Sequence, residues 1–275
     1  MSVGRLGISL ALMSSAAPPA SPPPLTPQEA ERWLSSARLT RYLTPAGGSL
    51  PVALKLYEWN ALTAAVALTE TAHLEVAMRN AYDRALCSAY PDWLDEASAL
   101  WSRYNGTVVQ RAQQAKANDD TLAALDVAWR PFESRTGQRP SSTTGGVRDK
   151  VIANTTFGVW SHLTDSEREK TIWTPALRKA FPPRQARGVV HRLALDVNTF
   201  RNRLAHHEPL FTRTTAFASR IRQVRLLHAL LDPASADWCY ERSQTSSVVG
   251  RCPIKGLIQW NPALDQPPSS LLTTP

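Results

Sequence analysis

The residues best suited to chemistry lie between Phe200 and Phe211, in the stretch FRNRLAHHEPLF. Six polar side chains fall within eight consecutive positions, in a chain that has only six histidines: Arg201, Asn202, Arg203, His206, His207 and Glu208. Histidine takes up and releases protons near neutral pH, and the arginine guanidinium stays charged and binds two phosphate oxygens at once. These residue types fit the cleavage of an RNA phosphodiester bond, which needs a proton-transfer group and a cation that stabilises the transition state.

The spacing of these residues allows two interpretations. On a helix of 3.6 residues per turn, Asn202 and His206 lie nearly above one another, and the long side chain of Arg201 can reach the same place from the side. Basic residues near the C-terminus of a helix are, however, also stabilised by the helix dipole without any function. Spacing alone leaves an active site and a charged helix end equally open.

Other chemistries fit the sequence less well. The adjacent His206 and His207 point in different directions from a helix, and no HExxH pattern is present, so we expect no metal site and no cofactor. The chain also lacks the G-x-S-x-G nucleophile elbow of many hydrolases. Its three cysteines are too scattered for a disulfide framework or a paired zinc site, and reduced thiols in a cytoplasmic protein are the expectation.

The elements that must position the cluster are helices, because the sequence has no convincing run of strands and no repeats. Thr26, Pro27 and Glu29 form a helix-start signal with a capping box. Pro209 is expected to end the helix that carries the cluster. A second short helix is expected to hold Leu39, Tyr42 and Leu43, and one long helix or two nearly collinear ones are expected over residues 51–89. Further helices are expected over residues 98–128, 171–181 and 214–231, which makes the fold class all-α.

Hydrophobic spacing predicts which faces of these helices are buried. In the long helix 51–89 the apolar positions recur at mostly three-and-four spacing: Leu54, Tyr57, Ala61, Leu62, Ala65, Leu68, Ala72, Val76 and Met78. Glu75 and Arg79 on this helix form either an exposed ion pair or part of a polar site. In the helix 214–231, Ile221, Val224, Leu227 and Leu230 are expected to face the core, whereas Arg220, Arg222 and Arg225 are expected to point outward.

Composition predicts three regions: a Pro/Ala/Ser-rich leader at 1–25, a helical domain at 26–235 and an irregular C-terminal tail at 236–275. The first residues loosely resemble a signal peptide, but an upstream extension before a true start at Met13 explains them as well. No stretch reaches the roughly 18 apolar residues of a membrane span, so we expect no membrane partner. The net charge of +8 favours a polyanionic partner such as RNA.

The segment RNRLAH resembles the R-N-x-x-x-H form of the R-x(4–6)-H motif of the HEPN superfamily. Four blocks in order resemble its Abi-like (abortive infection) branch: LYEWNALTAAVALTETAHLEVAMRNAYDRAL, FGVWSHL, IWTPALRKAFP and RNRLAHHEPLF. The resemblance covers roughly residues 26–235. It implies an HEPN-like helical bundle with additional helices, and many such domains are metal-independent ribonucleases in defence and toxin systems.

The resemblance also implies roles for individual residues. Arg201 and His206 match the catalytic pair, and Asn202 would orient the active groups. The family's E-x-x-x-R-N pattern falls on Glu75, Arg79 and Asn80, and its HHE pattern falls on His206, His207 and Glu208, so these residues and Arg203 are expected to support the site or bind RNA. The resemblance further implies a homodimer with a shared cleft, and an antitoxin or regulatory partner is a further expectation.

Three functions therefore remain open for this sequence. The first is an abortive-infection or toxin-type endoribonuclease that cuts RNA by 2′-hydroxyl attack. The second is a catalytically inactive helical module that binds RNA or a protein in phage defence. In the third, the cluster is only a charged helix end in a dimer interface.

Overall fold

The computed structural model describes residues 23–134, 137–212 and 216–272, and these ranges contain helices and no strand. The predicted all-α class is thereby confirmed. The α-helices are α1 Pro27–Leu34, α2 Ser36–Leu43, α3 Leu50–Cys87, α4 Val108–Trp129, α5 Val147–Asn154, α6 Phe157–His162, α7 Arg187–Ala205, α8 Ala216–Leu231, α9 Pro233–Glu241 and α10 Thr245–Gly250. The predicted leader at 1–25 lies outside the described residues except for its last three positions.

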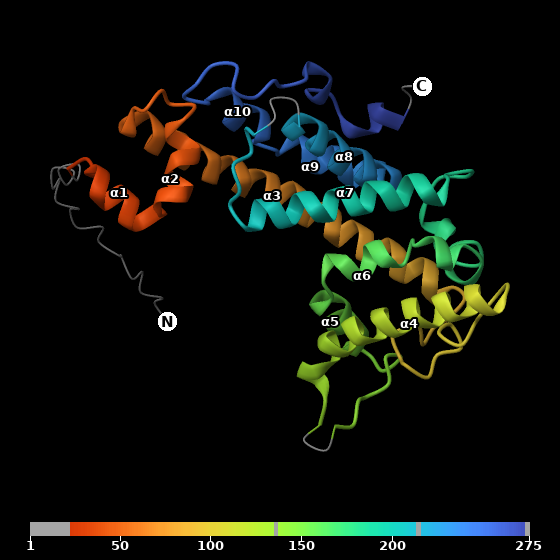
Figure 1. Cartoon of the computed structure of the whole chain (residues 1–275). Helices are drawn as coiled ribbons and strands as arrows, with labels where there is room; N and C mark the ends of the chain where they lie inside the picture. Colours follow the sequence, from red (N-terminus) through yellow and green to blue (C-terminus); the bar gives the residue numbers. More distant parts are fainter. Residues whose placement is uncertain (1–22, 135–136, 213–215, 273–275) are drawn as a thin grey trace, which may run out of the picture.

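The long helix α3 organises the molecule (Figure 1). At its beginning it packs against α2, and along its length it contacts α7, α8, α9 and α10. Helices α4, α5 and α6 form a lobe near its other end, and α7 runs in the opposite direction to α3 (Figure 1). Through its contact with α6, α7 also joins the lobe to the rest of the molecule.

Local signals in the sequence set several helix boundaries. The hydroxyl of Thr26 accepts a hydrogen bond from the Glu29 amide at 3.3 Å, and the Glu29 carboxylate accepts one from the Thr26 amide at 2.8 Å. This reciprocal pair satisfies amides that the first turn of a helix leaves unbonded. The predicted start of α1 is confirmed. Helix α4 begins only at Val108, ten residues after the start predicted for it, behind its own capping box at Thr107.

The predicted buried face of α3 is wrong. Of its nine apolar positions only Met78 is fully buried, whereas Leu62 is 58% exposed and Val76 is 43% exposed. The buried face instead carries Leu56, Leu74 and several polar residues. Apolar residues occur on every side of this helix, so periodicity alone could not select the face that its neighbours cover.

The C-terminal segment differs most from expectation. The predicted irregular tail 236–275 contains most of α9, all of α10 and two 3₁₀ turns, Pro262–Leu264 and Pro268–Leu272. Arg225, predicted to point outward, is 4% exposed and donates to the Glu70 carboxylate at 2.7 and 2.8 Å. The same carboxylate accepts from Ser243 and Thr245, so one buried group on α3 fixes the segment after α9.

The segment 171–181, predicted as a short α-helix, forms one turn that is wider than an α-helix and one that is tighter. A π-helical turn spans Glu169–Trp173, and a 3₁₀ turn spans Leu177–Ala180.

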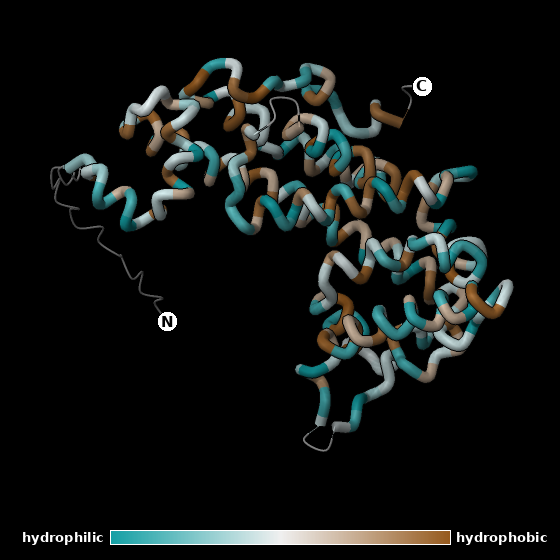
Figure 2. Tube along the Cα trace, in the orientation of Figure 1, coloured by the Kyte–Doolittle hydropathy of each residue, from teal (hydrophilic) through white to brown (hydrophobic). Residues whose placement is uncertain are grey.

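No helix in the described part of the chain is long and apolar enough to cross a membrane. Hydrophobic and hydrophilic residues alternate along the helices instead (Figure 2).

Candidate active site at the end of helix α7

The backbone at the end of α7 is fixed by a Schellman turn. The amide of Glu208 donates to the Arg203 carbonyl at 3.1 Å, and the amide of His207 donates to the Leu204 carbonyl at 3.0 Å. These two bonds satisfy carbonyls that the last turn of a helix leaves free. The turn requires a left-handed residue, and His207 adopts it with φ +52° although glycine is the usual choice at this position.

Asn60 on α3 anchors the chain directly after this turn. Its side-chain oxygen accepts from the Leu210 amide at 2.9 Å, and its side-chain nitrogen donates to the Glu208 carbonyl at 3.3 Å. Asn60 is 1% exposed. The helix end therefore holds a defined position against α3, with Pro209 buried between the two bonds.

Of the three side chains predicted to do chemistry, Arg201 and Asn202 lie on the last turns of α7, and His206 is its C-cap residue. Asn202 and His206 are exposed and joined through the backbone, since the His206 amide donates to the Asn202 carbonyl at 3.0 Å. Arg201 is partly exposed, and its Nη1 lies 3.5 Å from the Oδ1 of Asn202. Among the described residues, no carboxylate forms an ion pair with Arg201, and the imidazole of His206 has no hydrogen-bond partner.

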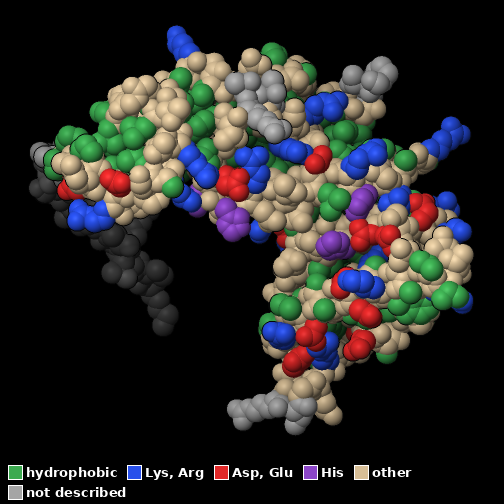
Figure 3. All heavy atoms as spheres, in the orientation of Figure 1, with side chains coloured by type: hydrophobic (Ala, Val, Ile, Leu, Met, Phe, Trp, Pro, Cys, Tyr) green, Lys and Arg blue, Asp and Glu red, His purple; other side chains and the backbone are tan. Residues whose placement is uncertain are grey.

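The neighbouring charged residues are engaged with each other. Arg203 Nε donates to Glu208 Oε2 at 2.8 Å, which ties the two ends of the Schellman turn together. Figure 3 shows Lys or Arg, Asp or Glu and His side chains gathered over this end of α7. Arg203 and Glu208 thus stabilise the turn, whereas Arg201 has no ion-pair partner among the described residues.

The second predicted set, Glu75, Arg79 and Asn80, lies elsewhere on α3. Arg79 donates to the Ala153 carbonyl of α5 at 3.3 Å, and no ion pair joins it to Glu75 in the described residues. Asn60 and Arg79 are 19 residues apart, which corresponds to about 28 Å of helix. No hydrogen bond or ion pair between described residues joins this set to Arg201 or His206, so one copy of the chain leaves the two sets unconnected.

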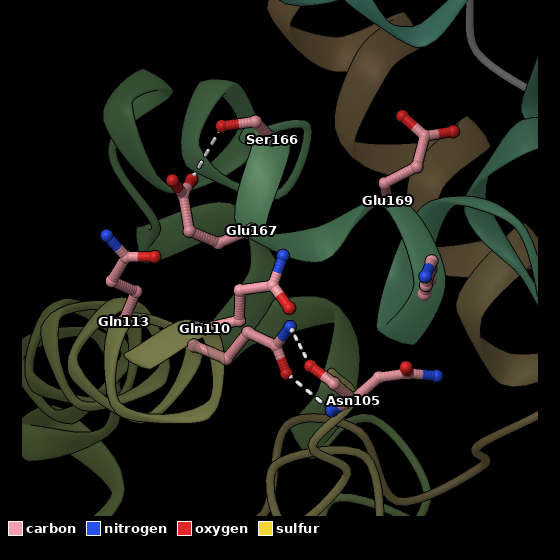
Figure 4. Close-up of a pocket in the computed structure, with 8 residues that line it drawn as sticks. Asn105, Gln110, Gln113, Ser166, Glu167 and Glu169 are labelled. Atoms are coloured by element: carbon pink, nitrogen blue, oxygen red, sulfur yellow. Dashed lines mark hydrogen bonds between the residues drawn. The ribbon is translucent and has the colours of Figure 1, made fainter. Parts of the chain in front are cut away.

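A polar hollow lies at the beginning of α4, away from this cluster (Figure 4). It has a volume of about 240 Å³ and is lined by amide and acidic side chains. The side-chain oxygen of Gln114 accepts a hydrogen bond from the Asn105 amide at 2.8 Å, and its side-chain nitrogen donates one to the Asn105 carbonyl at 3.0 Å. The Ser166 hydroxyl donates to the Glu167 carboxylate. Because these contacts hold the loop before α4, we assign this hollow a structural role.

A more apolar hollow of about 330 Å³ lies between α3, α8 and α9. Asn80 lines it together with His73, Arg84 and Trp238. His228 lies at its edge, where it is 5% exposed and its Nε2 is 3.1 Å from the Ser235 hydroxyl. Burial lowers the pKa of His228 to about 4, so this imidazole is neutral in the folded protein.

Reasoning from the sequence did not select Asn60, although this residue positions the site. The available signal was an amide in a helix whose neighbouring residues are apolar, since a buried amide must find hydrogen-bond partners. No group of three or more His, Cys, Asp or Glu side chains among the described residues could hold a metal ion.

No family model matches the chain, and no curated protein or solved structure matches it. The functional assignment therefore depends on the resemblance of the sequence motifs together with the geometry at the end of α7.

Proposed function

We propose that this protein is an Abi-like endoribonuclease of the HEPN superfamily that cleaves RNA without a metal ion. The observation that carries the proposal is the state of Arg201, Asn202 and His206 at the end of α7. A guanidinium with no carboxylate partner in the described part of the chain lies on the same helix end as an exposed imidazole, on a backbone fixed by the Schellman turn and by Asn60. An arginine in this state favours a phosphate group as its ligand.

The reaction needs two proton transfers. The RNA 2′-oxygen attacks phosphorus while its proton passes to a base, and the bond from phosphorus to the 5′-oxygen breaks as that oxygen receives a proton. The products are a 2′,3′-cyclic phosphate and a 5′-hydroxyl. His206 acts as the base or the acid, Arg201 stabilises the charge on the phosphate oxygens, and the Asn202 amide orients the guanidinium.

The proposal also names partners and a biological role. RNA is the substrate, the net charge of +8 favours its approach, and a second copy of the chain completes the site. Cleavage of cellular RNA by such an enzyme would be toxic, which fits abortive infection in phage defence and a regulatory partner such as an antitoxin.

The experiment is an RNA cleavage assay in EDTA with the full chain and with Arg201→Ala and His206→Ala. We expect each variant to lose about 100-fold or more in rate, because each removes a group that acts in the transition state. Arg192→Ala is the matched control, since it removes an exposed arginine from the same helix. Mass spectrometry of the products should find the cyclic phosphate.

Three results would each refute the mechanism: full activity in both variants, cleavage only with a divalent ion, or a product that carries a 5′-phosphate. Salt-sensitive RNA binding without any cleavage would instead identify a binding module. Loss of stability in Arg201→Ala without a change in RNA cleavage would identify a charged helix end.

A further inference from the structure

Four aromatic rings form a row from the surface of α1 to the segment that follows α7. Trp33 of α1 contacts Tyr57 of α3, with ring centroids 5.3 Å apart. Tyr57 contacts Tyr42 of α2 at 5.3 Å, and Tyr42 contacts Phe211 at 5.5 Å. Each contact is edge-to-face, which is a favourable arrangement for aromatic rings. These four residues, the aromatic row, connect α1 and α2 to the chain directly after the candidate site.

The aromatic row passes from the core to the surface along its length. Tyr42 is fully buried and Phe211 is 8% exposed, whereas Trp33 is 61% exposed. The indole of Trp33 is therefore held by Tyr57 while most of its surface faces solvent. An aromatic ring that is both fixed and open offers a platform on which another flat ring can stack.

Helix α3 anchors the aromatic row and the candidate site within one turn. Tyr57 and Asn60 are three residues apart, which is about 4.5 Å along the helix. Tyr57 holds Trp33, and Asn60 bonds the backbone at Glu208 and Leu210. Figure 1 shows α1 and α2 at the same end of the molecule as the C-terminal end of α7. One extended ligand can therefore contact both the row and the candidate site.

The segment that carries the first three rings of the row is positively charged. Residues 32–57 contain four Lys or Arg residues and no Asp or Glu. Two of the four, Arg38 and Arg41 of α2, are exposed and form no ion pair within the described part of the chain. Burial, and then the neighbouring Tyr57, raise the pKa of Tyr42 to about 12, and the charges of both arginines oppose that rise. The two cations therefore lie close to the middle of the row.

We propose that α1 and α2 bind a single-stranded part of the RNA substrate, with one base stacked on Trp33 and phosphates bound by Arg38 and Arg41. An open indole beside two exposed guanidinium groups suits a flexible chain that carries both flat rings and negative charges. A duplex fits less well, because its bases are stacked inside it and cannot reach the indole. The inference rests on the proposed function, since the bound strand continues to the phosphate that Arg201 and His206 act on.

A second exposed tryptophan provides a comparison within the same chain. Trp238 of α9 is 54% exposed, but the guanidinium of Arg242 lies over its ring, 4.0 Å from the centroid. One stacking position on that indole is therefore already occupied by a cation. No such cation lies over Trp33 among the described residues, so Trp238 is a matched control for exposure but not for stacking.

The first test measures the binding of a labelled single-stranded RNA by fluorescence anisotropy. The full chain carries His206→Ala throughout, so that the RNA stays intact during the measurement. We expect Trp33→Ala to raise the dissociation constant about fivefold or more, because one stacked base is lost. Trp33→Phe should keep most of the affinity, since it retains an aromatic ring. Trp238→Ala should leave the dissociation constant unchanged.

The second test separates stacking from charge. The double variant Arg38→Gln with Arg41→Gln should lower the slope of log affinity against log salt by about 1.4, because each phosphate contact on a single strand contributes about 0.7. Trp33→Ala should leave this slope unchanged, since stacking releases no counterion. Arg111→Gln is the control: Arg111 is exposed on α4 and forms no ion pair within the described residues, and its replacement should change neither quantity.

RNA binding that neither Trp33→Ala nor the double arginine variant weakens would overturn this surface. An equal loss in Trp238→Ala, or an equal effect of Trp33→Ala on a duplex of the same sequence, would overturn the stacking. Binding through α1 and α2 by a native chain that cleaves no RNA would refute the proposed function and leave the surface standing. Cleavage with RNA binding that these variants leave unchanged would do the reverse.

Discussion

The strongest test of the fold is to replace the residues of the buried ion pair between Glu70 and Arg225. The Glu70 carboxylate accepts four hydrogen bonds, from two guanidinium nitrogens and from the hydroxyls of Ser243 and Thr245. Burial by itself raises the pKa of Glu70, but the bonds and charge of Arg225 outweigh it and hold the pKa below its ordinary value. Arg225 also donates to the Leu264 carbonyl at 2.5 Å.

Removing one partner leaves the other charged and buried. The Glu70 and Arg225 side chains are 9% and 5% exposed, so water cannot replace the lost contacts. We therefore expect Glu70→Ala to lower the free energy of unfolding by about 3 to 5 kcal/mol. The midpoint of thermal unfolding should fall by on the order of 10 °C. Glu70→Ala combined with Arg225→Met should be less destabilised than Glu70→Ala alone, because no unpaired charge remains.

The assay is chemical and thermal unfolding of the native chain, both single variants and the double variant. Lys116→Ala is the control, because its pair with Asp120 is 76% and 66% exposed and should contribute less than about 1 kcal/mol. The reasoning is refuted if Glu70→Ala costs no more than this control, or if the double variant is as unstable as the sum of the two single variants.

Two further predictions concern groups near the candidate site and the α9 hollow. Asn60→Ala should lower the free energy of unfolding by about 1 to 3 kcal/mol and reduce RNA cleavage, because the buried Leu210 amide loses its acceptor; Asn60→Asp, which keeps that acceptor, should retain more of both in denaturation and cleavage assays. His228 has an ordinary pKa of 6.5 and a folded pKa of about 4, so the unfolded chain binds a proton that the folded chain does not, and stability should fall by about 2 to 3 kcal/mol as the pH drops from 7 to 4. His228→Gln should flatten that dependence in unfolding measured across this range, and an unchanged slope would contradict the assignment.

The sequence predicted the parts of the fold that depend on local interactions. The capping box at Thr26 set the start of α1, because it acts within a few residues of itself. The helix that carries the cluster ends at Ala205, four residues before Pro209, so the proline predicted that the helix stops in this region but not the residue at which it stops. The positions of Arg201, Asn202 and His206 on one helix end follow from the same local periodicity. Their assignment to RNA cleavage stays a proposal.

Contacts between distant residues decided what the sequence left open. Arg225 looked like one more surface arginine, yet a carboxylate 155 positions away makes it a core residue. Asn60 binds the chain 150 positions further on, and no local pattern reveals that pairing. The sequence of the C-terminal segment is typical of a loop, because its Gly, Pro and Ser residues disfavour long helices. In the structure its helices pack against α3 and α8.

Helix α3 shows most clearly what the sequence alone determines and what the packing of the helices decides. Its composition alone predicted a long helix, or two nearly collinear ones, over residues 51–89, because helix propensity and the absence of internal glycine act residue by residue. The structure has one helix there, Leu50–Cys87. Which side of it is buried depended on where α7, α8 and α9 pack, and they cover a face that includes Asn60 and Glu70 and leave Leu62 and Val76 exposed. Burial is a property of the whole assembly of helices, so only the tertiary structure could decide it.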